Sequence, residues 1–361
     1  MIRVLHIVTS LAATGVPTLL YSYYSRMDRE KIQFDFVAIP SKVEHTYKQK
    51  FEDLGCQVYY MPKKYVGRIP FLYKLMKNGH YDVVHSHIEL ASAVYLSIAL
   101  VAGVKVRIAH AHMAFLPYTK IQHKCLRYLL NTVATLRLGC SKDALIGLFG
   151  NKEGIVLHNA IDIDKFNYNP STRKQYREQL NIDDRIVLGF VGRFTRQKNV
   201  FYILEIFKNI LELNNNALLL IAGDGEQKDE FFVKAEQLHI RDHILYLGSR
   251  NDIPSLMMAM DGLLLPSLWE GLGIVLIEAQ AAALMTFTSR YTVPYEDTNI
   301  SQYIHYLDIT EEPIVWARAI NEYIQGYEKI SVKDQLKAHH YDINIEKDNL
   351  LSIYEKAIVD K

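Results

Sequence analysis

The most informative stretch of this chain reads Pro266-Ser267-Leu268-Trp269-Glu270-Gly271-Leu272-Gly273-Ile274-Val275-Leu276-Ile277-Glu278-Ala279. The four residues before it, 262–265, form an apolar run that is typical of a buried strand. The chain breaks at Pro266, passes two glycines and continues with a helical pattern. Strand, glycine-rich turn and helix start follow one another directly. We therefore expect the backbone amides of Gly271, Leu272 and Gly273 to lie close to a bound phosphate.

Two carboxylates, Glu270 and Glu278, lie on either side of this turn. If one helix carried both, they would be separated by about 12 Å along its axis. That exceeds the separation of about 5–9.5 Å in the acid/base pair of a glycosidase. The spacing suits two hydroxyl-rich groups joined by a diphosphate, such as a nucleotide ribose and a hexose. The alternative is an ordinary strand–turn–helix unit with surface glutamates.

The Glu-x7-Glu pattern after a Pro-Ser strand end resembles the signature of the retaining glycosyltransferases of family 4. Within that family the chain is most similar to the bacterial branch that makes capsular polysaccharide and exopolysaccharide, and the resemblance extends over nearly all of it. It implies an α/β fold of two Rossmann-like domains that face a central cleft, called GT-B. It also implies that Glu278 binds the ribose hydroxyls and that Glu270 orients the donor sugar.

The first half of the chain, residues 1–165, alternates strand and helix patterns. This alternation predicts a parallel sheet with helices on both faces, which would be the acceptor domain. We expect a last helix at about 344–361 to cross back onto it. Gly15 lies in the loop after the first expected strand. The family carries paired glycines there, facing the donor phosphate and the acceptor, whereas this chain has one, for which a simple turn is the alternative.

Histidines mark the ends of two further strands, which we expect at residues 81–87 and 107–113. Alternation along a strand places His110 and His112 on one face of the sheet. By resemblance, His112 lies beside the donor sugar and the reaction centre; a structural histidine at a strand end is the alternative. Since neither His-x-His pair has a carboxylate or cysteine partner in its motif, we expect no metal site.

The second half, residues 166–343, is the expected nucleotide-sugar donor domain. An apolar strand at 186–192 ends at Arg193, and Lys198 follows at the start of a helix. Both cations can point to the carboxyl edge of the sheet, where open α/β sheets bind ligands. There they could hold a diphosphate and neutralise the charge that develops as it leaves. Isolated surface charges are the alternative.

Two weaker features of this half come from the family alone. Arg250 follows a strand whose next loop packs on the nucleobase in the family, so we expect it near the donor. The family usually continues after the glycine-rich turn with Gly-Leu-Pro, where this chain has Ala283-Leu284-Met285. The missing glycines leave a non-catalytic partner of a transferase complex as an alternative function.

Charge is unevenly distributed along the 361 residues. Residues 1–165 have a net charge of +9 and the remainder −8, and residues 90–142 carry seven basic side chains and no acidic one. A basic half indicates an anionic partner surface. No nucleic-acid-binding motif is present, so we favour the cytoplasmic membrane leaflet. The basic, apolar segment 63–77 could lie on it, or could equally be an ordinary amphipathic helix with snorkelling lysines. For the charge distribution, the alternative is charge scatter together with attraction between the two halves.

Localisation follows from three observations. The three cysteines are widely spaced, which fits a reducing compartment. Residues 1–8 indicate a first strand rather than a signal peptide. The longest uncharged apolar run, 90–104, has 15 residues, fewer than the roughly 18–20 that span a bilayer, and predicts a buried helix. We expect a cytoplasmic protein, with peripheral contact to the inner face of the cell membrane as a further hypothesis.

The prediction for function is a retaining, metal-independent glycosyltransferase. It would move a hexose or N-acetylhexosamine from a nucleotide diphosphate sugar, for which we expect UDP, to a hydroxyl of a glycan or lipid-diphosphate-linked acceptor. We expect no cofactor and no nucleic-acid partner. Two alternatives remain: the non-catalytic nucleotide-sugar-binding partner, and a nucleotide-sugar epimerase on the same architecture.

Overall fold

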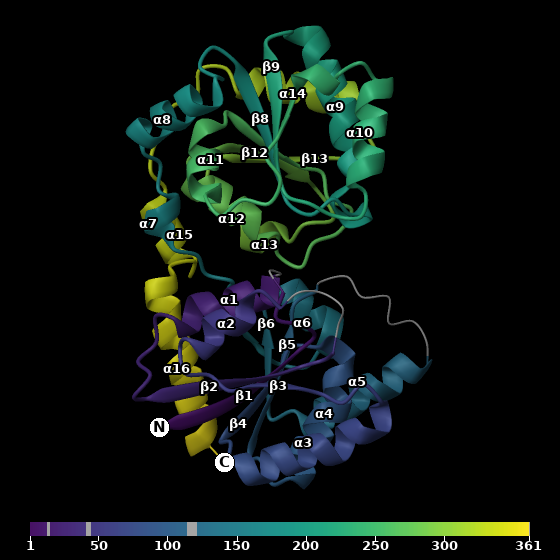
Figure 1. Ribbon diagram of the computed structural model, residues 1–361, viewed down its shortest axis with the longest axis vertical. Helices are drawn as coiled ribbons and strands as arrows, with labels where there is room; N and C mark the ends of the chain where they lie inside the picture. Colours follow the sequence, from purple (N-terminus) through teal and green to yellow (C-terminus); the bar gives the residue numbers. More distant parts are fainter. Residues whose placement is uncertain (13–14, 41–44, 114–120, 361) are drawn as a thin grey trace. The chain divides into compact units, whose positions relative to one another are not determined.

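The computed structural model describes residues 1–12, 15–40, 45–113 and 121–360, which form two compact units (Figure 1). The first unit contains Met1–Ala160 and Asp342–Lys361, and the second contains Ile161–Tyr341. Each unit is a parallel sheet with helices on both faces, as the alternating pattern predicts. No helix in the described part of the chain is both long enough and apolar enough to cross a bilayer.

The first unit contains a seven-stranded sheet in the order β3-β2-β1-β4-β5-β6-β7. Its strands are β1 (Ile2–Val8), β2 (Ile32–Ala38), β3 (Val58–Tyr60), β4 (Val83–Ser86), β5 (Val106–Ala111), β6 (Leu136–Gly139) and β7 (Ile155–Val156). Its helices are α1 (Gly15–Tyr24), α2 (Tyr47–Glu52), α3 (Tyr65–Gly79), the 3-10 turn η1 (Glu89–Ala91), α4 (Ser92–Val101), α5 (Ile121–Val133), α6 (Lys142–Phe149) and α16 (Ile343–Val359).

The C-terminal helix α16 completes the core of this first unit. Val4 and Val8 of β1 pack in one buried cluster with Phe34 and Phe36 of β2 and with Tyr354 of α16. Since side chains alternate along a strand, His6 points to the same face as Val4 and Val8. Tyr354 is fully buried and its hydroxyl bonds His85 Nδ1 at 2.8 Å, so the end of the chain is tied to the start of the fold.

The apolar run at 90–104 forms α4, but this helix is not buried all round. Its inner face includes Ala93, Leu96 and Ala99, which are fully buried, whereas Val101 is 74% exposed. α4 lies between α3 and α5 and covers β4 and β5 on one side only. Most residues of this helix are therefore buried, as expected for the apolar run, and only its outer face is exposed.

The second unit contains a six-stranded sheet in the order β10-β9-β8-β11-β12-β13. Its strands are β8 (Ile186–Val191), β9 (Ala217–Ala222), β10 (Ile244–Tyr246), β11 (Gly262–Leu265), β12 (Met285–Ser289) and β13 (Ile304–Leu307). Its helices are α7 (Ile163–Phe166), α8 (Pro170–Leu180), η2 (Arg196–Lys198), α9 (Val200–Leu213), α10 (Lys228–Gln237), η3 (Arg241–His243), α11 (Ile253–Ala259), α12 (Ile274–Ala281), α13 (Tyr295–Thr298), α14 (Pro313–Tyr323) and α15 (Lys333–Ala338).

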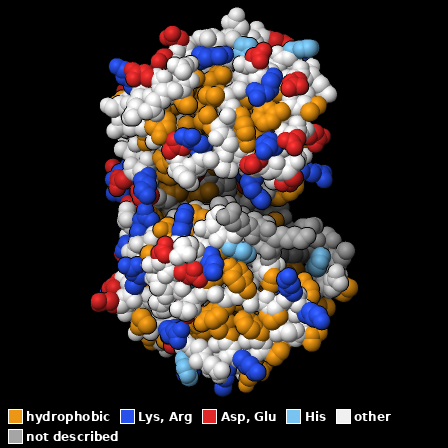
Figure 2. All heavy atoms as spheres, in the orientation of Figure 1, with side chains coloured by type: hydrophobic (Ala, Val, Ile, Leu, Met, Phe, Trp, Pro, Cys, Tyr) orange, Lys and Arg blue, Asp and Glu red, His pale blue; other side chains and the backbone are white. Residues whose placement is uncertain are grey.

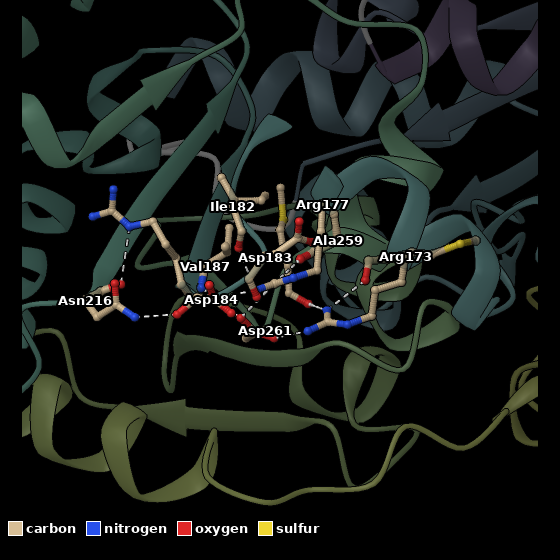
Figure 3. A network of polar contacts seen from close by, with 12 residues as sticks. Arg173, Arg177, Ile182, Asp183, Asp184, Val187, Asn216, Ala259 and Asp261 are labelled. Atoms are coloured by element: carbon tan, nitrogen blue, oxygen red, sulfur yellow. Dashed lines mark hydrogen bonds and ion pairs between the residues drawn. The ribbon is translucent and has the colours of Figure 1, made fainter. Parts of the chain in front are cut away.

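Buried arginines fasten α8 to the amino ends of the strands (Figure 3). Arg177 is 7% exposed and donates to the carbonyls of Ala259 and Ile182 at 2.8 Å. Arg173 pairs with Asp261 at 2.5 Å, and Asp261 in turn accepts the backbone amide of Val187 at the start of β8. Ordering these groups rigidifies the edge opposite to the one where ligands bind in such sheets.

The boundary between the units lies before the expected position. Residues 161–165, which we expected in the first domain, belong to the second, because Ile161 donates its amide to Tyr341 and α7 packs on α11 and α12. The second unit ends at Tyr341 rather than at residue 343, since Asp342 caps α16 through the amide of Asn344.

Candidate functional site

The second unit brings the expected donor residues to one edge of its sheet. β8 pairs with β9 on one side and with β11 on the other, so the strand order of the sheet reverses direction at β8. The loops that follow β8 and β11 meet at this reversal, which is where open α/β sheets bind ligands. The amide of Leu268 donates to the carbonyl of Gln197 at 2.8 Å and joins the two loops directly.

Glu270 is the centre of a hydrogen-bonded cluster in these loops. Its side chain is 5% exposed, and Oε1 accepts from Lys198 Nζ at 2.5 Å and from Ser267 Oγ at 2.6 Å. Oε2 accepts from Gln197 Nε2 at 3.3 Å, and the backbone amide of Glu270 donates to Thr292 at 2.8 Å. A buried carboxylate held by this many donors has one orientation.

The two expected cations differ in their surroundings. Lys198 ends the 3-10 turn η2 before α9, and its side chain is 17% exposed beside Glu270. Arg193 follows Gly192 after β8, is exposed, and has no hydrogen-bond or ion-pair partner among the described residues. One cation is thus neutralised within the protein, and the other is free to bind an anion.

The glycine-rich turn adopts a conformation that requires glycine. Gly273 has φ +77 and precedes α12 directly, and a Cβ there would lie 3.2 Å from Leu276. Leu272 is buried at 3% exposure, so its side chain anchors the turn. The helix begins only at Ile274, so Glu270 lies outside it, and the 12 Å estimate for two glutamates on one helix does not apply.

Glu278 lies in the second turn of α12 and is half-buried. It has no hydrogen-bond or ion-pair partner in the described part of the chain, and burial raises its pKa to about 7. An unpaired carboxylate with a raised pKa is costly for the fold, and such groups concentrate at functional sites. Glu278 is therefore the carboxylate of this site that remains available to a ligand.

Two further expected residues contribute less to this geometry. Arg250 makes a two-pronged ion pair with Asp252 at 2.6 and 2.8 Å, so its guanidinium is occupied by the start of α11. Gly15 is the first residue of α1 in the other unit, and a Cβ added to it would meet nothing within 4 Å. Neither position requires its residue type on packing grounds.

His112 lies at the carboxyl edge of the first unit, directly after β5. Its backbone amide donates to Glu89 Oε1 at 2.9 Å, and its Nε2 is 2.9 Å from His87 Nδ1. Burial lowers the pKa of His112 to about 4, so the imidazole is neutral near pH 7. Glu89 has φ +49, and burial raises its pKa to about 7. A strained residue with a perturbed carboxyl beside His112 indicates a functional edge.

Five histidines pack ring against ring on one face of the sheet: His6, His85, His87, His110 and His112. Two overlapping sets of three, which share His87, bring ring nitrogens within 4.8 Å of one another. Both nitrogens of His87 already bond to neighbouring histidines, at 3.0 and 2.9 Å. A metal would have to break these bonds, so the arrangement fits a hydrogen-bonded chain better than a set of ligands.

Sequence reasoning missed three residues of these two edges. Ser267 and Gln197 orient Glu270, although both stand inside the stretches that the sequence singled out. Glu89 is the only acidic side chain between Asp82 and Asp143 and follows a strand end, which was the available signal. Its contact with the His112 amide depends on how η1 turns, and the sequence does not show that.

Known proteins resemble this chain over its whole length. A family model described as "Glycosyl transferases group 1" matches residues 172–336. The putative glycosyltransferase EpsF of Bacillus subtilis is 30% identical over 98% of this chain and 96% of its own. The capsular polysaccharide biosynthesis glycosyltransferase CapH of Staphylococcus aureus is 25% identical over 98% of this chain and 99% of its own.

Two further proteins extend the comparison. The UDP-Gal:alpha-D-GlcNAc-diphosphoundecaprenol alpha-1,3-galactosyltransferase of Escherichia coli is 32% identical over 60% of each chain. The crystal structure of Anabaena Alr3699/HepE in complex with UDP superposes with a TM-score of 0.82 at 18% identity, covering 98% of this chain and 100% of that one. The two Rossmann-like units are thus those of the GT-B fold, and the chain belongs to the group 1 glycosyl transferases.

Proposed function

We propose that this glycosyltransferase moves a hexose or N-acetylhexosamine from a UDP-sugar to a hydroxyl, with retention of anomeric configuration and without a metal ion. The acceptor would be a glycan or a lipid-diphosphate-linked sugar in capsular or exopolysaccharide synthesis. The observation that carries this proposal is the Lys198–Glu270 ion pair beside Arg193 at the strand reversal of the second unit. Two cations and a helix start at that edge are suited to a diphosphate.

Each residue of this edge has a proposed role. Arg193 and Lys198 bind the diphosphate and stabilise the charge on it as it leaves, with the amides of Gly271, Leu272 and Gly273 nearby. Glu270, held rigidly by Ser267 and Lys198, accepts hydrogen bonds from hydroxyls of the donor sugar. Glu278, which has no partner among the described residues, binds the ribose hydroxyls. Gly15 and Arg250 are secondary contacts to the donor.

His112 of the first unit is proposed to stabilise the reacting sugar. Its low pKa of about 4 makes it a poor proton acceptor at neutral pH, which is consistent with a reaction that has no dedicated base on this residue. In a front-face mechanism the leaving phosphate helps to deprotonate the acceptor hydroxyl. As the bond from the anomeric carbon to the phosphate breaks, the acceptor oxygen bonds to the same face of that carbon and its proton passes to the leaving phosphate.

The relatives support the choice of nucleotide and acceptor. The Escherichia coli relative uses UDP-galactose and a sugar diphosphoundecaprenol by name, and the Anabaena structure contains UDP. CapH is named for capsular polysaccharide. The sugar is left as a class because the loops that choose it differ between such enzymes.

Exposed apolar side chains on the first unit support the proposed contact with an anionic membrane. On α3, Tyr65, Val66 and Ile69 are 77%, 85% and 56% exposed, and Lys63, Lys64 and Lys74 lie around them. Figure 2 shows hydrophobic side chains with Lys and Arg among them on the face of this unit that is in view. Apolar insertion with basic flanks is the usual chemistry of a helix at an anionic bilayer surface.

The first experiment is a thermal shift with UDP, GDP, ADP and CMP at matched concentration. A nucleotide at 100 times its dissociation constant should stabilise the fold by about 2.7 kcal/mol. Trp269 lies next to Glu270 and gives a second readout, because a bound nucleotide should change its fluorescence while fully buried Trp316 stays constant. A shift with UDP alone supports the donor class, and no shift with any nucleotide would contradict the proposed donor site.

The second experiment measures turnover with UDP-sugars and a lipid-diphosphate-linked acceptor. Proton NMR of the product reports the anomeric configuration, and excess EDTA tests metal independence. An inverted product or a loss of activity in EDTA would contradict those two parts of the proposal separately. Consumption of the UDP-sugar without an acceptor would indicate the epimerase instead.

A further inference from the structure

Three histidines of the first unit are hydrogen-bonded in series. His6 Nδ1 lies 3.0 Å from His87 Nε2, and His87 Nδ1 lies 2.9 Å from His112 Nε2. His6 is on β1, His87 follows β4 and His112 follows β5, so the series crosses three adjacent strands. It runs from a fully buried ring, His6, to His112, which is the more exposed end.

Each ring in this series carries one proton. Burial lowers the pKa of His6 to about 3 and that of His112 to about 4, and it holds the pKa of His87 well below its usual value. A neutral imidazole has one N–H donor and one acceptor nitrogen. His87 uses both its nitrogens, so only two proton arrangements satisfy both bonds, and they run in opposite directions.

The two arrangements differ at the ends of the series. In the first, His6 donates from Nδ1, His87 donates from Nδ1, and His112 accepts at Nε2 and therefore carries its own proton on Nδ1. In the second, His112 donates from Nε2 and the spare proton of His6 is on its Nε2. That atom is buried and has no partner among the described residues.

The energetic cost of leaving His6 Nε2 unpaired decides which of the two proton arrangements is more stable. Orphaned buried N–H groups are rarer in proteins than under-used acceptors, because an unpaired donor loses its only hydrogen bond. The first arrangement leaves a bare lone pair on His6 Nε2, and the second leaves a bare N–H. The first is therefore the more stable arrangement.

We propose that His87, backed by His6, is a positioning residue that fixes His112 as the Nδ1–H tautomer. His112 then presents a hydrogen-bond donor rather than a lone pair to the substrate oxygen that it contacts. The backbone of the same residue is held independently, because its amide bonds Glu89 Oε1 at 2.9 Å. The contact with substrate rests on the proposed function, whereas the tautomer of His112 does not.

Nitrogen NMR tests the tautomer directly. Protein labelled with 15N-histidine gives two-bond correlations between the ring nitrogens and the protons on the ring carbons. Their pattern identifies the protonated nitrogen, and His112→Asn assigns the signal. We expect Nδ1–H on His112 in the wild-type protein at pH 7. A proton on His112 Nε2 would overturn the proposal without any measurement of activity.

A variant at the middle of the series tests the effect on turnover. His87→Phe removes the donor to His112 Nε2 and frees that nitrogen to carry the proton. We expect the Nδ1–H signal of His112 to be lost and kcat to fall about tenfold to a hundredfold, as for other residues that orient a functional group. KM for the nucleotide sugar should change little, because the donor site lies in the second unit.

The matched control is His110→Leu. His110 packs against His112 with ring centroids 4.1 Å apart, and neither of its nitrogens has a partner among the described residues. This variant should keep the His112 tautomer and the wild-type kcat. If His87→Phe also keeps both, the positioning role is wrong. If the wild-type protein lacks turnover with every donor, the proposed function fails, and the NMR result still tests the tautomer.

Discussion

The two units have the same strand order around their central strands but opposite chemistry at the carboxyl edge. In the first unit the edge carries a cluster of neutral histidines, with His6 and His85 fully buried and Glu89 alongside. In the second unit it is a charged cluster in which Lys198 and Glu270 pair at 2.5 Å beside the unpaired Arg193. In such sheets the strand order determines where a ligand can bind, and the side chains at that edge determine which ligand it is.

We propose that this difference corresponds to the two halves of a sugar nucleotide reaction. A charged edge suits the diphosphate, whose negative charge grows as it leaves. A neutral edge that offers hydrogen bonds without charge suits sugar hydroxyls, which need orientation more than neutralisation. Four experiments test this contrast.

The largest effect is expected at the charged edge, from Lys198→Ala. Turnover should fall by about 10²–10³, since the variant removes a donor to the developing charge. The variant also leaves Glu270, 5% exposed, without its cation, which should cost about 3–5 kcal/mol of unfolding free energy. Steady-state kinetics and urea unfolding measure the two effects.

Two controls separate catalysis from stability. Lys198→Met combined with Glu270→Gln removes the unpaired charge, so it should recover stability but not turnover. Arg196→Ala changes an exposed cation in the same 3-10 turn and should alter the unfolding free energy by less than about 0.5 kcal/mol. Near-normal turnover in Lys198→Ala would remove this lysine from the mechanism.

The neutral edge should make the first unit sensitive to acid. His6 has a pKa of about 3 in the folded protein and about 6.5 in the unfolded chain. Its contribution to the free energy of unfolding is therefore complete above pH 6.5 and is lost as the pH falls. At pH 5 the loss from His6 alone is about 2 kcal/mol. His85, His87 and His110 have lowered pKa values and act in the same direction.

Urea unfolding at pH 7 and pH 5 measures this sensitivity. Trp269 and Trp316 both lie in the second unit, so their fluorescence follows that unit, while far-UV circular dichroism follows both. His6→Phe should reduce the pH dependence of the first unit, whereas His80→Asn, at an exposed position of the same unit, should not. Equal pH dependence in wild type and His6→Phe would show that His6 is protonated in the fold.

Glu278→Gln tests the ribose role with an intermediate effect. Loss of a charged acceptor should weaken UDP binding by about tenfold, which is about 1.4 kcal/mol. Because burial raises the pKa of Glu278 to about 7, the folded protein favours the protonated carboxyl. Its contribution to the free energy of unfolding is therefore lost as the pH rises from about 4.5 through 7. Nucleotide affinity of the wild type should conversely rise over this range.

Calorimetry with UDP at pH 6 and pH 8 measures both expectations for Glu278. In Glu278→Gln the pH dependence should disappear. Glu212→Gln, which removes one exposed carboxylate from α9 in the same unit, is the control for net charge and should bind UDP as the wild type does. Unchanged affinity in Glu278→Gln would contradict the ribose role.

The smallest effect is expected at Ala283. It has φ +49, a left-handed conformation that costs a residue with a Cβ about 1–2 kcal/mol. Ala283→Gly should therefore stabilise the second unit by about 1 kcal/mol, less the extra entropy of glycine in the unfolded chain. Ala282→Gly, at φ −78, should destabilise instead, and thermal unfolding followed by Trp fluorescence distinguishes the two.

Most of the fold could be predicted from local patterns. The apolar run before Pro266, the glycines and the helix after them correspond to β11, the turn and α12, because hydrophobic period and turn chemistry are local properties. The position of the charged edge was also predictable, since Arg193, Lys198 and Glu270 all stand in the segments that follow β8 and β11. The missing glycine at Ala283 became interpretable once its positive φ was known.

The sequence alone was enough to establish the α/β class, the two-domain organisation and the family resemblance, because these depend on periodicity and on short motifs. It could not show that Ser267 and Gln197 hold Glu270, that Arg250 is paired with Asp252, or that three histidines from β1, β4 and β5 bond in series. The Gln197–Glu270 contact and the histidine series join residues far apart in the chain, and they arise only when parallel strands lie side by side in register and bring separate strand ends to one edge. The Ser267–Glu270 and Arg250–Asp252 contacts are local, but they depend on how each loop folds, which the sequence pattern does not show.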